Sequence, residues 1–72
     1  MDKSFVKASI LRIDEHIRTG ELHVVQQRRI VTELIQLGLE HEQSLALLKN
    51  FELLVNQHKA HRETLLGPPG GA

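Results

Sequence analysis

Cysteine, tryptophan and tyrosine are absent from this 72-residue sequence, and phenylalanine occurs only at Phe5 and Phe51. Without cysteine the chain has neither disulfide bonds nor a thiolate metal site. With two aromatic side chains it offers almost no surface on which bases stack, which is the usual way to hold single-stranded nucleic acid. A folded core must therefore come from leucine, isoleucine and valine.

An excess of charge of either sign is also absent, because nine basic residues balance nine acidic ones. A neutral chain lacks the positive field that attracts phosphates, so composition disfavours nucleic acid as a partner. No apolar run approaches the roughly 18 residues that span a bilayer, and the polar segment Met1–Ser4 leads into no signal sequence. We expect a soluble cytoplasmic protein with no membrane partner, and the lack of cysteine fits a reducing compartment.

One apolar stripe with heptad spacing organises the first half of the chain. Its a positions are Ile10, Ile17, Val24 and Val31, and its d positions are Val6, Ile13, Gly20, Gln27 and Leu34. The stripe keeps its phase across Gly20, which predicts one continuous helix over residues 3–37. Glycine inside a helix costs about 1 kcal/mol relative to alanine. A break at Gly20 is therefore the alternative, and it would give a three-helix bundle.

A turn is predicted directly after this helix, over residues 38–40. Gly38 suits the left-handed residue that ends a helix, and Leu39 and Leu34 are spaced as the apolar pair of a Schellman motif. The second helix is predicted over residues 41–65. The chain would then reverse its direction at Gly38.

The predicted fold is all-α, with one antiparallel helical hairpin over residues 1–66. The segment 67–72, which is rich in glycine and proline, is expected to be a flexible tail. At about 1.5 Å per residue the helices span roughly 50 and 36 Å, so the second reaches back only to about Ile13. This leaves the start of the first helix uncovered, at Phe5, Val6, Ile10 and Leu11.

Two helices alone cannot enclose a core, so the hairpin needs a partner. A second copy is the simplest one, and a homodimer of hairpins is a four-helix bundle. Another helical protein is the alternative partner. The expected interface residues are Phe5, Val6, Ile10, Ile13, Ile17, Val24, Val31, Leu34, Leu48, Phe51 and Val55, while Gly20, Gly38 and Leu39 have structural roles.

Five histidines are many for a chain of this length. If the chain turns near Leu39, we expect His58 to lie near Gly20–Glu21 and His61 to lie near Ile17–Arg18. Neutral imidazoles bind zinc, nickel or copper, so a divalent metal is a candidate cofactor, although the carboxylates of a di-iron bundle are missing. Otherwise these histidines border the bundle, or form an interface that becomes charged near pH 6. The candidate ligands are His16, His23, His58 and His61.

Gln27 occupies a d position, where a polar side chain fixes register and oligomeric state at some cost in stability. We expect it to form a buried polar layer with Glu21 and Arg28. The serines and threonines show no spacing to a base that marks a nucleophile. The chain is therefore expected to be a non-enzymatic interaction or adaptor module without a cofactor.

Two other functions stay open from the sequence. The first is a histidine-mediated metal-binding or metal-responsive protein. The second is an RNA-binding helical bundle, although acidic neighbours make a solvated face the simpler interpretation. The basic residues in question are Arg28, Arg29, Lys49, Lys59 and Arg62.

The segments His16–Arg28, Leu34–Gly38 and Ala46–Phe51 together resemble a group of short bacterial helical-hairpin proteins. The pattern begins H-I-x-x-G-E-x-H-x-x-x-Q-R and continues through E-L-x-x-x-G to A-x-x-L-L-x-x-F-E, of which this chain has Leu47-Leu48 and Phe51-Glu52, with a late histidine before a basic segment. The group has no known function, so the resemblance implies no catalytic role. It covers about 9–65 and draws attention to His16, Gly20, Glu21, His23, Gln27, Arg28 and His58.

Overall fold

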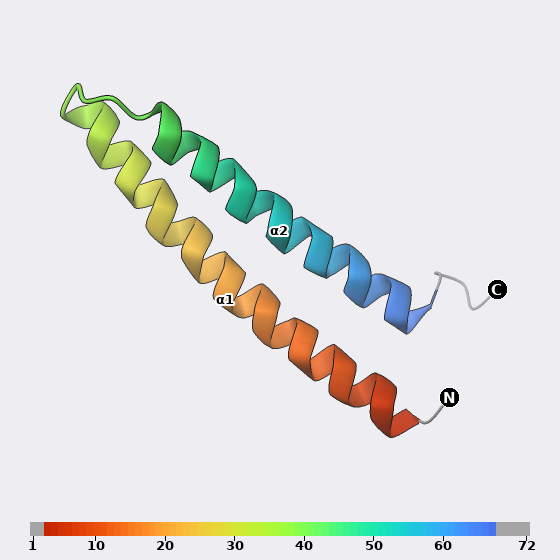
Figure 1. Ribbon diagram of the computed structural model, residues 1–72. Helices are drawn as coiled ribbons and strands as arrows, with labels where there is room; N and C mark the ends of the chain where they lie inside the picture. The colour runs from red at the N-terminus through yellow and green to blue at the C-terminus, as the bar shows by residue number, and fades with distance from the viewer. Residues whose placement is uncertain (1–2, 68–72) are drawn as a thin grey trace.

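The computed structural model describes residues 3–67, which form two α-helices and a short connection (Figure 1). Helix α1 is Lys3–Gln36 and helix α2 is Glu42–Leu66. They lie side by side and antiparallel, in a hairpin about 53 Å long and 15–22 Å across. The predicted all-α hairpin is confirmed. The expected flexible tail falls mostly on residues 68–72, which are outside the described part.

Helix α1 continues without a break through Gly20, so the alternative of a three-helix bundle is wrong. A Cβ atom at Gly20 would lie 2.7 Å from Cγ2 of Val55, which is a steric clash. The glycine therefore provides a notch into which Val55 packs. This close approach of the helices offsets the low helix propensity of glycine.

The chain reverses after α1 through the hydrogen bonds of a Schellman motif. The Leu39 N–H donates to the Leu34 carbonyl at 2.9 Å, and the Gly38 N–H donates to the Ile35 carbonyl at 3.0 Å. Gly38 has a φ of 69°, in the left-handed region that glycine adopts without strain. The residues that follow run back beside α1 before α2 begins at Glu42 (Figure 1).

The two helices meet along one seam, which uses the heptad positions predicted for α1. Because each inward side chain meets one opposing helix and has solvent on both flanks, much of the seam is half-buried rather than buried. The half-buried residues include Ile17, Gly20, Val24, Leu34 and Phe51. The buried hydrophobic residues are Ile13, Val31, Leu48 and Val55.

The start of α1 projects past the end of α2 (Figure 1), and Phe5 and Leu11 are exposed there. Val6 and Ile10 are half-buried, whereas the sequence suggested that they would be uncovered. The difference arises because α2 reaches further along α1 than expected. Arg62 already pairs with Asp14, and α2 continues for one more turn.

The notch at Gly20 leads to a prediction about stability. We expect Gly20→Ala to lower the free energy of unfolding by about 1 kcal/mol, because the clash with the stiff Val55 side chain exceeds the gain in helix propensity. In a Val55→Ala background the same substitution should raise that free energy by up to about 1 kcal/mol. Urea unfolding of the four variants checks this, and the same sign in both backgrounds would contradict it.

Candidate functional site

Two open grooves flank the seam, one on each side, and they differ in chemistry. The histidine groove has a volume of about 370 Å³ and no charged side chain among its lining residues. The charged groove has a volume of about 250 Å³. The histidine groove is lined by His16, Thr19, Gly20, His23, Phe51, Leu54, Val55 and His58. The charged groove is lined by Glu21, Val24, Val25, Arg28, Glu52, Val55, Asn56 and Lys59.

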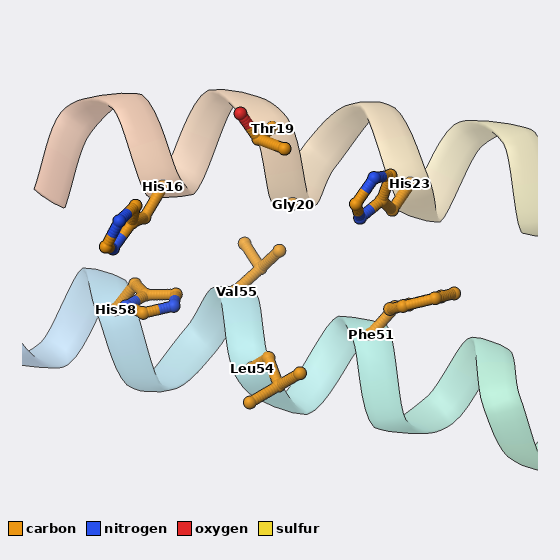
Figure 2. Close-up of a pocket in the computed structure, with 8 residues that line it drawn as sticks. All are labelled: His16, Thr19, Gly20, His23, Phe51, Leu54, Val55 and His58. Atoms are coloured by element: carbon orange, nitrogen blue, oxygen red, sulfur yellow. The ribbon is translucent and has the colours of Figure 1, made fainter.

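The histidine groove contains two ring contacts between the helices (Figure 2). The ring centroids of His16 and His58 lie 5.2 Å apart, with the ring planes tilted by 57°. Two turns further along α1, the ring of His23 lies 5.4 Å from the ring of Phe51. Val55 separates the two contacts where it packs into the notch at Gly20. The groove therefore presents imidazole and hydrocarbon together.

The structure corrects the predicted pairing of the histidines. Val55, rather than His58, lies opposite Gly20, and His58 faces His16. His61 is exposed and does not line the groove. Its neighbour Arg62 pairs with Asp14, so this part of α2 lies about one helical turn further along α1 than the sequence predicted. The cause is the path of the turn. The residues after Gly38 run back beside α1, which shifts every facing pair (Figure 1).

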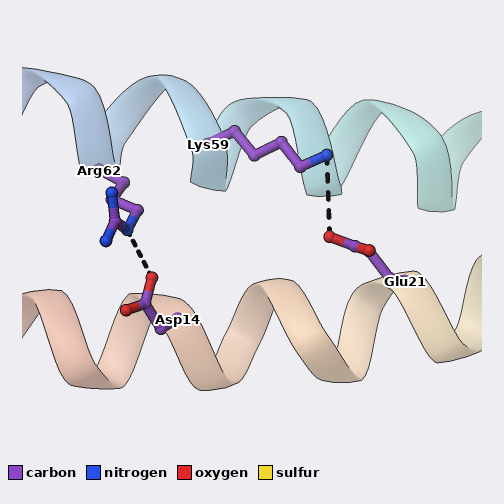
Figure 3. A network of polar contacts seen from close by, with 4 residues as sticks. All are labelled: Asp14, Glu21, Lys59 and Arg62. Carbon is purple, nitrogen blue, oxygen red and sulfur yellow. Dashed lines mark hydrogen bonds and ion pairs between the residues drawn. The ribbon is translucent and has the colours of Figure 1, made fainter.

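Ion pairs join the helices on the side of the charged groove (Figure 3). The Arg62 Nε donates to Asp14 Oδ1 at 2.5 Å, and Lys59 Nζ lies 3.7 Å from Glu21 Oε1. All four side chains are at least one-third exposed, so each pair contributes less than about 1 kcal/mol. The two pairs neutralise charge on this side of the hairpin, and they add little to its stability.

Gln27 is buried at its d position, with 7% of its surface exposed. Its Nε2 donates to the carbonyl of Ser44 at 2.9 Å, which joins α1 to the first turn of α2. The expected partners of this polar layer lie elsewhere, because Glu21 and Arg28 are exposed and line the charged groove. The polar layer is one glutamine bound to the backbone of the opposite helix.

The side chains predicted to form an interface between copies lie mostly in the seam of the hairpin itself. All of them except Phe5 are buried or half-buried between α1 and α2. Their contact with a second copy stays a prediction. Other large apolar side chains are left on the outside, including Leu22, Val25, Ile30, Leu47, Leu53 and Leu54.

Within residues 3–67, no three or more histidine, aspartate or glutamate side chains converge as a set of metal ligands. Thr19 lines the histidine groove, but no hydrogen bond joins it to an imidazole in the described part of the chain. Neither described helix is long and apolar enough to cross a membrane. Comparisons of the chain with known protein families, with curated proteins and with solved structures find no match.

Gln27 and its neighbour Gln26 form a matched pair for testing the polar layer. We expect Gln27→Ala to lower the free energy of unfolding by about 1–2 kcal/mol, because it removes a buried hydrogen bond and leaves a cavity. Gln26→Ala, at an exposed position, should change it by less than about 0.5 kcal/mol. Equal effects in urea unfolding would show that Gln27 contributes nothing special to the seam.

Proposed function

We propose that the chain is a non-enzymatic helical interaction module that acts by associating with a second copy of itself. The proposal is carried by the imbalance between buried and exposed apolar side chains in residues 3–67. Four hydrophobic side chains are buried, whereas twelve large ones are 44–71% exposed. Two helices cannot bury more, because each turns only one face toward the other.

A second copy is the partner that the hairpin's own properties favour. Full burial of a leucine or isoleucine side chain contributes about 1.5–3 kcal/mol, so covering the exposed parts of several such side chains would offset part of the entropy cost of association. The chain has no net charge, so two copies do not repel each other. Two hairpins packed face to face give each helix a second apolar neighbour, as in a four-helix bundle.

The histidine groove is the side on which we place the second copy. Charged groups lose hydration when an interface forms, and they are depleted at the centre of interfaces. The charged groove is lined by Glu21, Arg28, Glu52 and Lys59, whereas the lining of the histidine groove carries no such group. Phe51 and Leu54 supply apolar surface there, and the same patch on the second copy would complete a symmetric contact.

The other functions have weaker support. An RNA-binding bundle needs an excess of positive charge, but the chain is neutral, and Lys59 and Arg62 are already paired with acidic residues. The proposal also places the module in the cytoplasm, because a chain without cysteine suits a reducing compartment in which disulfides do not form.

A metal-binding function has one specific observation in its favour, which is the contact between the rings of His16 and His58.

Leu54 and Val25 allow a test that separates the two grooves. They are 50% and 53% exposed, and they line the histidine groove and the charged groove, respectively. We expect Leu54→Glu to weaken self-association at least about 10-fold, because it places a carboxylate in an apolar interface. Val25→Glu should change the dissociation constant by less than about threefold.

Sedimentation equilibrium of the wild-type chain and both variants measures these constants. Far-UV circular dichroism confirms that each variant keeps its helices. A wild-type chain that stays monomeric at all accessible concentrations would contradict self-association and point to a different helical partner. Equal weakening by both substitutions would show that the histidine groove is not the interface.

A further inference from the structure

We propose that His16 and His58 form a two-histidine site for a divalent transition metal such as zinc. The two side chains come from different helices and face each other across the histidine groove (Figure 2). Neutral imidazole is a preferred ligand of zinc, copper and nickel. Both ligands come from a single hairpin, so the site needs no residue of a second copy, although the proposed dimer places that copy over the same groove.

The separation of the two rings fits coordination of one ion. With a Zn–N distance of about 2.0–2.1 Å and each ring nitrogen about 1.1 Å from the ring centre, a ring centroid lies about 3.2 Å from zinc. At a tetrahedral angle of about 109°, two such centroids are about 5.2 Å apart. The centroids of His16 and His58 are 5.2 Å apart, which is the separation expected for two imidazoles on one tetrahedral ion.

The helix packing around the pair fixes this separation. One turn away on each helix, Val55 fills the notch at Gly20, which sets the distance between the two backbones. On the opposite side of the seam, Arg62 is bound to Asp14. Coordination requires one nitrogen of each ring to face a shared point, and rotation about the Cβ–Cγ bond is the movement that changes the direction of these nitrogens.

The exposure of the pair suits a site that is open to solvent. In the single hairpin His16 is exposed and His58 is half-buried, so an ion can reach both rings when no second copy covers the groove. Two histidines fill two of the four tetrahedral positions, and water or another exchangeable ligand would fill the other two. With no carboxylate or thiolate among the groove residues, the site would bind metal reversibly rather than as a permanent structural centre.

The remaining histidines do not share this arrangement. The ring of His23 contacts Phe51, and it is two helical turns away from His16. His61 is exposed outside the groove, and His41 lies in the turn, where its Nδ1 is 3.2 Å from the Leu39 carbonyl. Among the histidines of the described chain, His16 and His58 are therefore the pair that the fold brings together across the seam.

Isothermal titration of the full chain with zinc chloride tests the inference. We expect no more than one zinc ion per hairpin, with affinity reduced at least about 10-fold by His16→Gln and by His58→Gln. The matched controls His61→Gln and His41→Gln should leave the affinity within about twofold. At a free zinc concentration 100 times the dissociation constant, the folding equilibrium constant should rise about 100-fold for the wild type, read from urea unfolding with and without zinc.

Three results would overturn the site. The first is that the wild type does not bind zinc. The second is that His16→Gln and His58→Gln both keep the wild-type affinity. The third is that His61→Gln and His41→Gln lose as much affinity as they do. Circular dichroism of each variant confirms that the helices are intact, which separates loss of a ligand from loss of the fold. If zinc binding fails at protein concentrations where the chain is monomeric, and the chain still dimerises at higher concentrations, the self-association proposal stands. If the chain binds zinc through His16 and His58 but stays monomeric, the metal site stands and the self-association proposal fails.

Discussion

The structure depends on a single packing seam between α1 and α2, because residues 3–67 contain no third element to support it. Along that seam, Val55 fits the notch at Gly20 and Gln27 binds the backbone at Ser44. These two contacts lock the register of the helices. That register determines which side chains meet across the seam, including the pair His16 and His58.

A single seam also separates the molecule into two different sides. On one side the flanking positions carry ion-paired charges, as between Lys59 and Glu21. On the other side they carry imidazoles and apolar side chains such as Leu54. A groove without charge can be covered at little desolvation cost, whereas a groove lined with charges is best left in water. The proposed dimer face and the proposed metal site therefore lie on the same side.

Local sequence signals predict the helices and the turn well. The heptad phase across Gly20 correctly indicated an unbroken helix, since a loop does not preserve a phase. The hydrogen bonds of the turn follow from Gly38, because its left-handed conformation depends on the residue itself. Features that a few neighbouring residues determine were thus readable without a structure.

The pairing across the seam was not predictable in the same way. It depends on the path of the chain between Gly38 and α2, and a shift of one turn exchanges His58 for Val55 opposite Gly20. The sequence therefore identified the histidines of the candidate site but placed them against the wrong partners. It also placed Glu21 and Arg28 in the polar layer with Gln27, because heptad position alone does not say which flank faces water.

We propose that a second copy covers the apolar surface that the single seam leaves exposed, and that this burial stabilises the fold. The most direct test is the midpoint of urea unfolding measured over a 100-fold range of protein concentration. If folding is coupled to association, the midpoint rises with concentration by mass action. A midpoint that is independent of concentration, together with a cooperative transition, would show that the hairpin is stable alone and would contradict the claim.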